Sequence, residues 1–154
     1  MIEEIYQPPQ SKLNIPRKKS GSIFKGVIFG GIVDIVGTIT YAIVFGIAYA
    51  IVLTVQGKSE SEITTIVENF ELYSVVGLLS LPFAFLISYY AGYLCAKKSG
   101  GDYKKSTAIL CVISGAFGFI VGFETHSLLD NIVLTILTVL AIVYGSKRWK
   151  SKCA

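Results

Sequence analysis

A single carboxylate, that of Asp34, lies inside an apolar run that extends from Val27 to Val55. It is about seven residues, or some 10 Å, into that run. A centrally placed Asp costs about 2.5 to 3.5 kcal/mol on membrane-insertion scales, so a compensating interaction is expected. The carboxylate could serve as a proton or cation site in a translocation path. Alternatively, it could form a polar link between helices or subunits, or reach water at the inner surface.

The residues at helical spacing around Asp34 indicate the surroundings that it needs. Its face carries small and hydroxyl-bearing residues: Gly26, Gly30, Gly37, Thr38 and Tyr41. We therefore expect Asp34 to point into a helix contact, where Tyr, Ser or Thr hydroxyl groups form hydrogen bonds with its carboxyl group. The predicted intramembrane polar site comprises Asp34, Thr38 and Tyr41.

A second group of polar residues, Glu124, His126 and Asp130, could bind a divalent cation. The support is weak, because His126 is the only histidine and Asp130 is explained as a charge at a helix N-terminus. We predict no metal site and no cofactor.

Catalytic motifs are missing from the sequence: there is no GxSxG, no P-loop and no GxGxxG after a strand. An enzyme is therefore not expected. The basic residues next to the apolar runs fit membrane topology and lipid headgroups better than nucleic acid. No CxxC pair occurs, and Cys95, Cys111 and Cys153 are expected to stay reduced.

The composition requires a membrane, since 53% of the 154 residues are hydrophobic and the mean hydropathy is +0.63. Four apolar runs are each long enough to span the bilayer, which has a hydrocarbon core of about 30 Å. We predict an all-α, four-transmembrane-helix bundle. Its helices should cover residues 24–55, 72–96, 106–123 and 127–146.

The basic residues fix the expected orientation. Of the 14 Lys and Arg residues, all except Lys58 fall in three clusters, 12–25, 97–105 and 147–152, which the helix count places on one side of the membrane. The positive-inside rule makes that side cytoplasmic, so both termini are predicted to be inside. The predicted domains are a disordered cytoplasmic tail (1–22), the transmembrane domain (23–146) and a basic cytoplasmic tail (147–154).

The external connection between the first two spanning helices should contain a short amphipathic helix. Ser59 and Glu62 form a possible capping box, and apolar residues follow at helical spacing. Ser127 is predicted as the N-cap of the last helix, which makes the connection before it very short.

The N-terminal tail contains Tyr6, Pro8 and Pro9 in a Tyr-x-Pro-Pro box, followed by a basic stretch. This segment, under a tenth of the chain, resembles the openings of small, uncharacterised four-helix proteins of the bacterial inner membrane. Those often have Asn-Pro before the tyrosine, where this chain has Ile5. The resemblance implies a bacterial inner membrane and no particular activity. The box favours polyproline II and is a candidate dock for a partner.

Small residues recur at four-residue spacing, which allows close helix packing in lipid. Besides Gly26, Gly30 and Gly37, these candidate packing faces comprise Ala84, Ser88, Gly92, Ser114, Gly118 and Gly122. They favour an accessory or structural subunit that packs in a homo-oligomer or a larger membrane complex, with lipids and a membrane protein as partners. The alternative is a small oligomeric transporter or channel in which Asp34 is the ion or proton site and Pro82 breaks the second helix.

Overall fold

The computed structural model describes residues 21–68, 74–123 and 127–151, and all of its regular elements are helices. Their bounds are α1 Ile23–Val55, α2 Glu60–Glu68, α3 Val75–Ser99, α4 Tyr103–Gly122 and α5 Leu128–Ser151. Four of them, α1, α3, α4 and α5, are long and apolar enough to cross a membrane. The predicted bundle of four long apolar helices, with a short helix between the first two, is confirmed.

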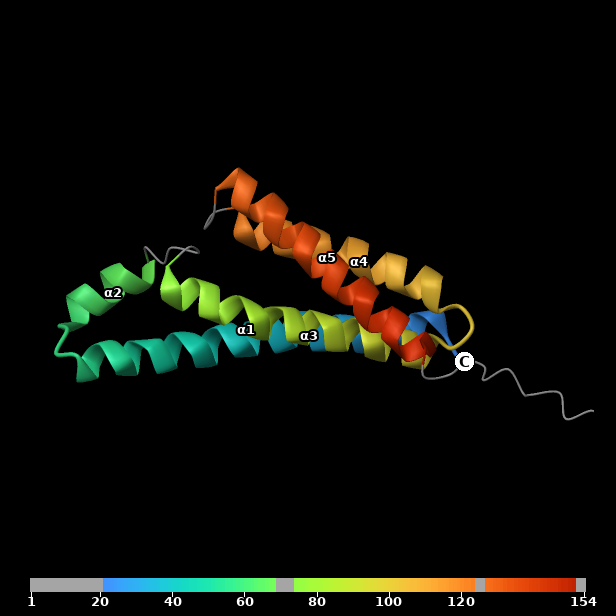
Figure 1. The fold of residues 1–154 in the computed structure, drawn as a ribbon, viewed down its shortest axis with the longest axis horizontal. Helices are drawn as coiled ribbons and strands as arrows, with labels where there is room; N and C mark the ends of the chain where they lie inside the picture. Colours follow the sequence, from blue (N-terminus) through green and yellow to red (C-terminus); the bar gives the residue numbers. More distant parts are fainter. Residues whose placement is uncertain (1–20, 69–73, 124–126, 152–154) are drawn as a thin grey trace, which may run out of the picture.

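The helices form two antiparallel pairs, α1 with α3 and α4 with α5 (Figure 1). The pairs meet at the end where α1 and α4 begin and where α3 and α5 end, and they diverge toward the other end. Helix α3 packs against both α1 and α5. It therefore joins the two pairs.

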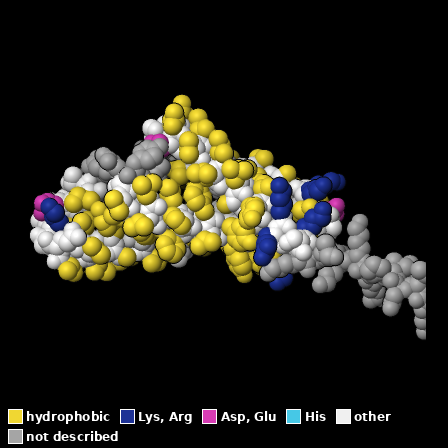
Figure 2. Space-filling view, in the orientation of Figure 1, with side chains coloured by type: hydrophobic (Ala, Val, Ile, Leu, Met, Phe, Trp, Pro, Cys, Tyr) yellow, Lys and Arg dark blue, Asp and Glu magenta, His cyan; other side chains and the backbone are white. Residues whose placement is uncertain are grey.

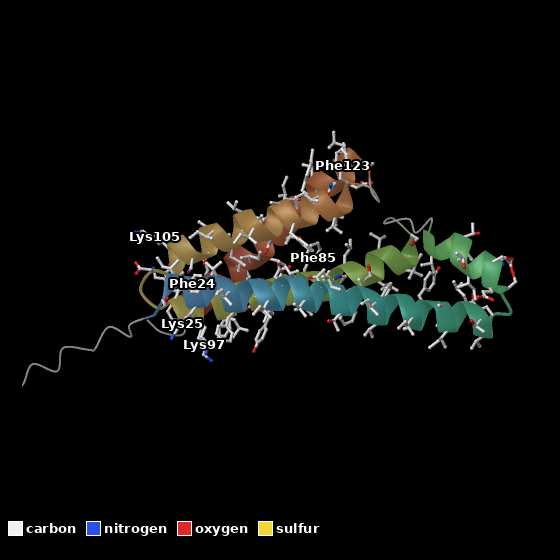
Figure 3. The ribbon with its side chains drawn as sticks, turned by 180° about the vertical axis from the view of Figure 1, so that it is seen from behind. Phe24, Lys25, Phe85, Lys97, Lys105 and Phe123 are labelled. Carbon is white, nitrogen blue, oxygen red and sulfur yellow. The ribbon has the colours of Figure 1, made fainter. Side chains whose placement is uncertain are left out.

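Basic side chains mark the end where the pairs meet, which is called the basic end below. Lys25, Lys97 and Lys105 lie there (Figure 3), and the last turn of α5 adds Arg148 and Lys150. Hydrophobic side chains cover most of the face in Figure 2, outside this basic end. Aromatic pairs lie at the same end, where the ring centroids of Tyr103 and Trp149 are 5.8 Å apart. This division into apolar and basic surface suits a bilayer and its headgroups.

The ends of α3 are set by capping residues and not by the limits of its apolar run. Helix α3 continues past residue 96 through Lys97 and Lys98 and ends before Gly100, whose φ of 62° suits glycine. At its other end, Ser74 accepts a hydrogen bond from the Gly77 backbone N–H at 3.0 Å and caps a helix that begins at Val75. Hydropathy marks the part of a helix that suits lipid, whereas capping residues decide where the helix ends.

Proline does not interrupt α3. The helix runs from Val75 to Ser99 as one element with Pro82 inside it. The expected break at Pro82 is therefore wrong. Membrane helices tolerate proline because neighbouring groups satisfy the backbone groups that it leaves free.

Two N-terminal caps predicted from the sequence are confirmed. The Ser59 N–H donates to Glu62 Oε2 at 2.9 Å, and the Glu62 N–H donates to Ser59 Oγ at 3.4 Å, which completes a capping box at α2. The Ser59 N–H and hydroxyl, which both donate to the Glu62 carboxylate, and the nearby Lys58 ammonium lower the pKa of Glu62. At α5, the Asp130 N–H donates to Ser127 Oγ at 3.2 Å.

Candidate functional site

The glycines of α1 bring its backbone close to α3. A methyl group added at Gly26 would overlap the Ser99 hydroxyl, and one added at Gly30 would crowd Cβ of Cys95. These two helices are antiparallel, so the contact continues one turn further along α1 at Asp34. The two glycines thus hold α1 near enough to α3 for Asp34 to reach a side chain on its neighbour.

That side chain is Ser88. Its hydroxyl donates to Asp34 Oδ1 at 2.6 Å, and both residues are buried, with exposed fractions of 4% and 5%. A distance this short is typical of a hydroxyl bound to a carboxylate. The expectation that a hydroxyl group from another helix compensates Asp34 is therefore confirmed.

Asp34 and Ser88 line a cavity of about 350 Å³ between the two helix pairs. All four long helices contribute to its wall, and Phe85 lies where the pairs separate (Figure 3). In addition to Asp34, eight residues with hydroxyl or amide side chains line it: Thr38, Tyr41, Ser80, Ser88, Ser114, Asn131, Thr135 and Thr138. These polar side chains are distributed over a lining whose exposed surface is mainly apolar.

The small residues of α3 and α4 help to create this space. Ala84 and Ser88 line the cavity from α3, and Ser114, Gly118 and Gly122 line it from α4. A methyl group added at Gly118 would have no atom within 4 Å, so this glycine is not at a tight contact. From the four-residue spacing alone, these residues were expected at helix contacts. In the structure they line the cavity, although Gly122 also contacts Asn131.

Ser114 stands out among the lining residues. Its exposed fraction is 4%, and its hydroxyl oxygen has no hydrogen-bond partner among the described residues. Serines in helices commonly donate to the carbonyl four residues earlier, as Ser99 does to Cys95 at 2.7 Å. A buried hydroxyl without a partner costs about 1 to 3 kcal/mol. The Ser114 hydroxyl oxygen is fully buried, so a solute in the cavity would not contact it in this arrangement of the helices.

The predicted companions of Asp34 also line the cavity. Tyr41 donates its hydroxyl to the Ser80 carbonyl oxygen at 3.0 Å, and its ring centroid lies 6.2 Å from that of Phe83. Thr38 lies between Asp34 and Tyr41 on the same face of α1. The structure thus brings Asp34, Thr38 and Tyr41 into one cavity.

One polar residue of this region, Asn131, was not predicted. It is 2% exposed, and its Nδ2 group donates to the Phe119 carbonyl oxygen at 2.8 Å, which ties α5 to the last turn of α4. The sequence carried a signal, because Asn131 is an isolated amide within an apolar run.

The closest approach between α3 and α5 is also made by glycine. A methyl group added at Gly92 would overlap the Ile142 carbonyl oxygen, and one added at Gly145 would overlap the Tyr89 carbonyl oxygen. Gly92 was among the predicted packing residues, whereas Gly145 was missed. Nearby, Cys95, Leu110 and Ile142 are fully buried against one another and close the bundle toward the basic end.

Several candidate sites fall partly or wholly outside the described residues. They include the Tyr6–Pro9 tail and, in the possible metal group, Glu124 and His126. Asp130 interacts with the Ser127 hydroxyl at 2.7 Å. Within the described ranges, no three His, Cys, Asp or Glu side chains gather closely enough to hold a metal ion.

Comparison of the chain with protein-family models, with curated proteins and with solved structures finds no significant match.

Proposed function

We propose that this chain is a small membrane transport protein, in which a cation or proton binds at Asp34 in the cavity between the two helix pairs. We place it in the bacterial inner membrane, with the basic end in the cytoplasm. One observation carries the proposal: a buried carboxylate and several hydroxyl-bearing side chains line one cavity inside a bundle of four long apolar helices.

The energetic cost of a carboxylate inside an apolar helix supports a role for Asp34 in binding a ligand. An apolar residue at position 34 would avoid the insertion cost of a carboxylate. A polar link alone accounts for Asp34 and Ser88, which pair with each other. It does not account for Thr38 and Thr138, whose hydroxyl-bearing side chains line the same cavity.

The shape of the bundle supports entry from one side. The cavity extends from Asp34 and Ser88 to Gly122 and Asn131, which are near the ends of α4 and α5 where the pairs diverge. In the other direction, Gly92 and Gly145 bring α3 and α5 into contact. With the basic end inside, the cavity would receive its ligand from the extracytoplasmic side.

Flux through proteoliposomes tests the proposal. Purified protein would be reconstituted, and proton and ²²Na⁺ uptake would be followed under an imposed membrane potential. The comparison is between wild type, Asp34→Asn and the matched control Asp102→Asn. Asp102 is exposed at the basic end and forms no side-chain cap for α4. We expect wild type and Asp102→Asn to transport one of the two cations. The flux of that cation through Asp34→Asn should be at least tenfold lower. Equal flux for the two variants would refute a role for Asp34.

The accessory-subunit hypothesis stays a prediction, and we place it second. Gly26, Gly30 and Gly92 lie at contacts within the chain, so these small residues are not free to bind another protein. Purification in mild detergent followed by mass spectrometry tests it. A second membrane protein recovered in fixed ratio would support a subunit, and recovery of this chain alone would contradict it.

A further inference from the structure

We infer that the ligand of the cavity is a small organic monocation with N–H donors, such as a primary ammonium ion that carries an aromatic or aliphatic group. This inference rests on the proposed function and specifies the ligand of the same site. It depends on the size, charge and lining of the cavity.

The size of the cavity leaves room for an organic cation in addition to a proton or a small ion. The cavity measures about 350 Å³, whereas one water molecule occupies about 30 Å³ in the liquid. Cavities that bind organic ligands begin at about 300 Å³. A dehydrated metal ion would leave most of this space to be filled by water, whereas an organic molecule of several heavy atoms would fill it.

The charge of the lining selects a monocation. Asp34 is the one Asp, Glu, Lys, Arg or His residue among the described residues that line the cavity. A single positive charge would neutralise its carboxylate. A divalent cation would leave one charge without compensation in a medium of low dielectric constant, where such a charge is costly.

The remaining lining residues suit an organic ammonium ion. Phe85, Phe117 and Tyr41 supply aromatic rings, which attract cations at their faces and pack against apolar groups. Thr38 and Thr138 line the cavity, and a threonine hydroxyl can accept a hydrogen bond from an ammonium N–H. A quaternary ammonium ion has no N–H to offer, so the site should prefer primary amines.

Equilibrium binding of 2-phenylethylamine to the full chain in lipid nanodiscs tests this inference. We expect saturable binding that Asp34→Asn weakens at least tenfold, while Asp34→Glu and the exposed control Asp102→Asn retain it. Thr38→Val should weaken binding severalfold, with little effect on the benzyltrimethylammonium ion. Ethylbenzene, which is of similar shape but uncharged, should not compete. Circular dichroism identifies any variant that fails to fold, and in that case the ligand comparison on wild type decides.

The outcomes separate the inference from the proposed function. Equal affinity of wild type for the amine and for ethylbenzene would overturn the inference, as would equal binding by Asp34→Asn and Asp102→Asn. Asp34-dependent proton or Na⁺ flux without amine binding would overturn it and leave the proposed transport in place. Asp34-dependent amine binding without any flux of protons, Na⁺ or amine would support the ligand class and refute transport.

Discussion

Two glycines permit the close contact between α3 and α5. The loss of stability on replacing either of them can therefore be predicted. In Gly92→Ala, the new methyl group would overlap the Ile142 carbonyl oxygen. A backbone atom cannot rotate away, so the helices must separate. Overpacking of this kind costs about 1 to 3 kcal/mol, and Ala recovers up to about 1 kcal/mol through its higher helix propensity. We expect a net destabilisation of about 1 to 2 kcal/mol.

Gly46→Ala is the matched control. A methyl group at Gly46 has no atom within 4 Å, so this change should leave the protein equally stable or up to about 1 kcal/mol more stable. Unfolding with SDS in mixed micelles, followed by circular dichroism, gives both free energies. A difference of about 2 kcal/mol corresponds to roughly a thirtyfold change in the folding equilibrium.

Gly145 lies on the α5 side of the same contact and provides a second test. Gly145→Ala should destabilise the protein by an amount similar to Gly92→Ala, because its methyl group would overlap the Tyr89 carbonyl oxygen. The double variant should cost less than the sum of the single changes, since separating the helices relieves both overlaps. If Gly92→Ala were as stable as Gly46→Ala, the described α3–α5 contact would be wrong.

Three further predictions concern single polar groups. Asn131→Leu should cost about 1 kcal/mol in the same unfolding assay, because it removes the hydrogen bond to Phe119; an unchanged free energy would mean that this bond contributes nothing. Ser127→Ala should cost about 1 kcal/mol and speed amide exchange in the first turn of α5, because it removes the N-cap; unaltered exchange would contradict the cap. The lowered pKa of Glu62 stabilises α2 above its unfolded-state pKa of about 4.3, and this stabilisation should be lost as the pH falls through the lower folded-state pKa. NMR amide shifts should report that loss in wild type and not in Glu62→Gln, and a pH response shared by both would refute it.

The sequence was sufficient for the number and kind of helices, because long apolar runs bounded by basic clusters are typical of membrane-spanning helices and rare in water-soluble domains. It was also sufficient for the surroundings of Asp34. A buried carboxylate on a glycine-rich helix face requires a close neighbour with a donor, and Ser88 meets that requirement. The identity of this neighbour depends on the register between α1 and α3, which helical periodicity within one helix does not specify.

The cavity could not be predicted, for a related reason. Small residues at four-residue spacing permit close packing, but they also leave space when two helices are held apart. Gly92 is an example of the first outcome and Gly118 of the second. Whether a small residue packs closely or leaves space depends on how far the helix pairs diverge at that position. That divergence depends on the contacts of all four long helices together.

Cysteine accessibility tests whether cationic solutes reach the cavity that contains Asp34. Gly118→Cys and Val112→Cys would be made in a background without the native cysteines. Gly118 lines the cavity and has open space around an added side chain, whereas Val112 is 71% exposed on the outer apolar surface of α4. We expect a small, cationic, membrane-impermeant methanethiosulfonate to modify Gly118→Cys in vesicles at least ten times faster than Val112→Cys. Equal resistance of both cysteines to this reagent would contradict a cavity that cations can enter.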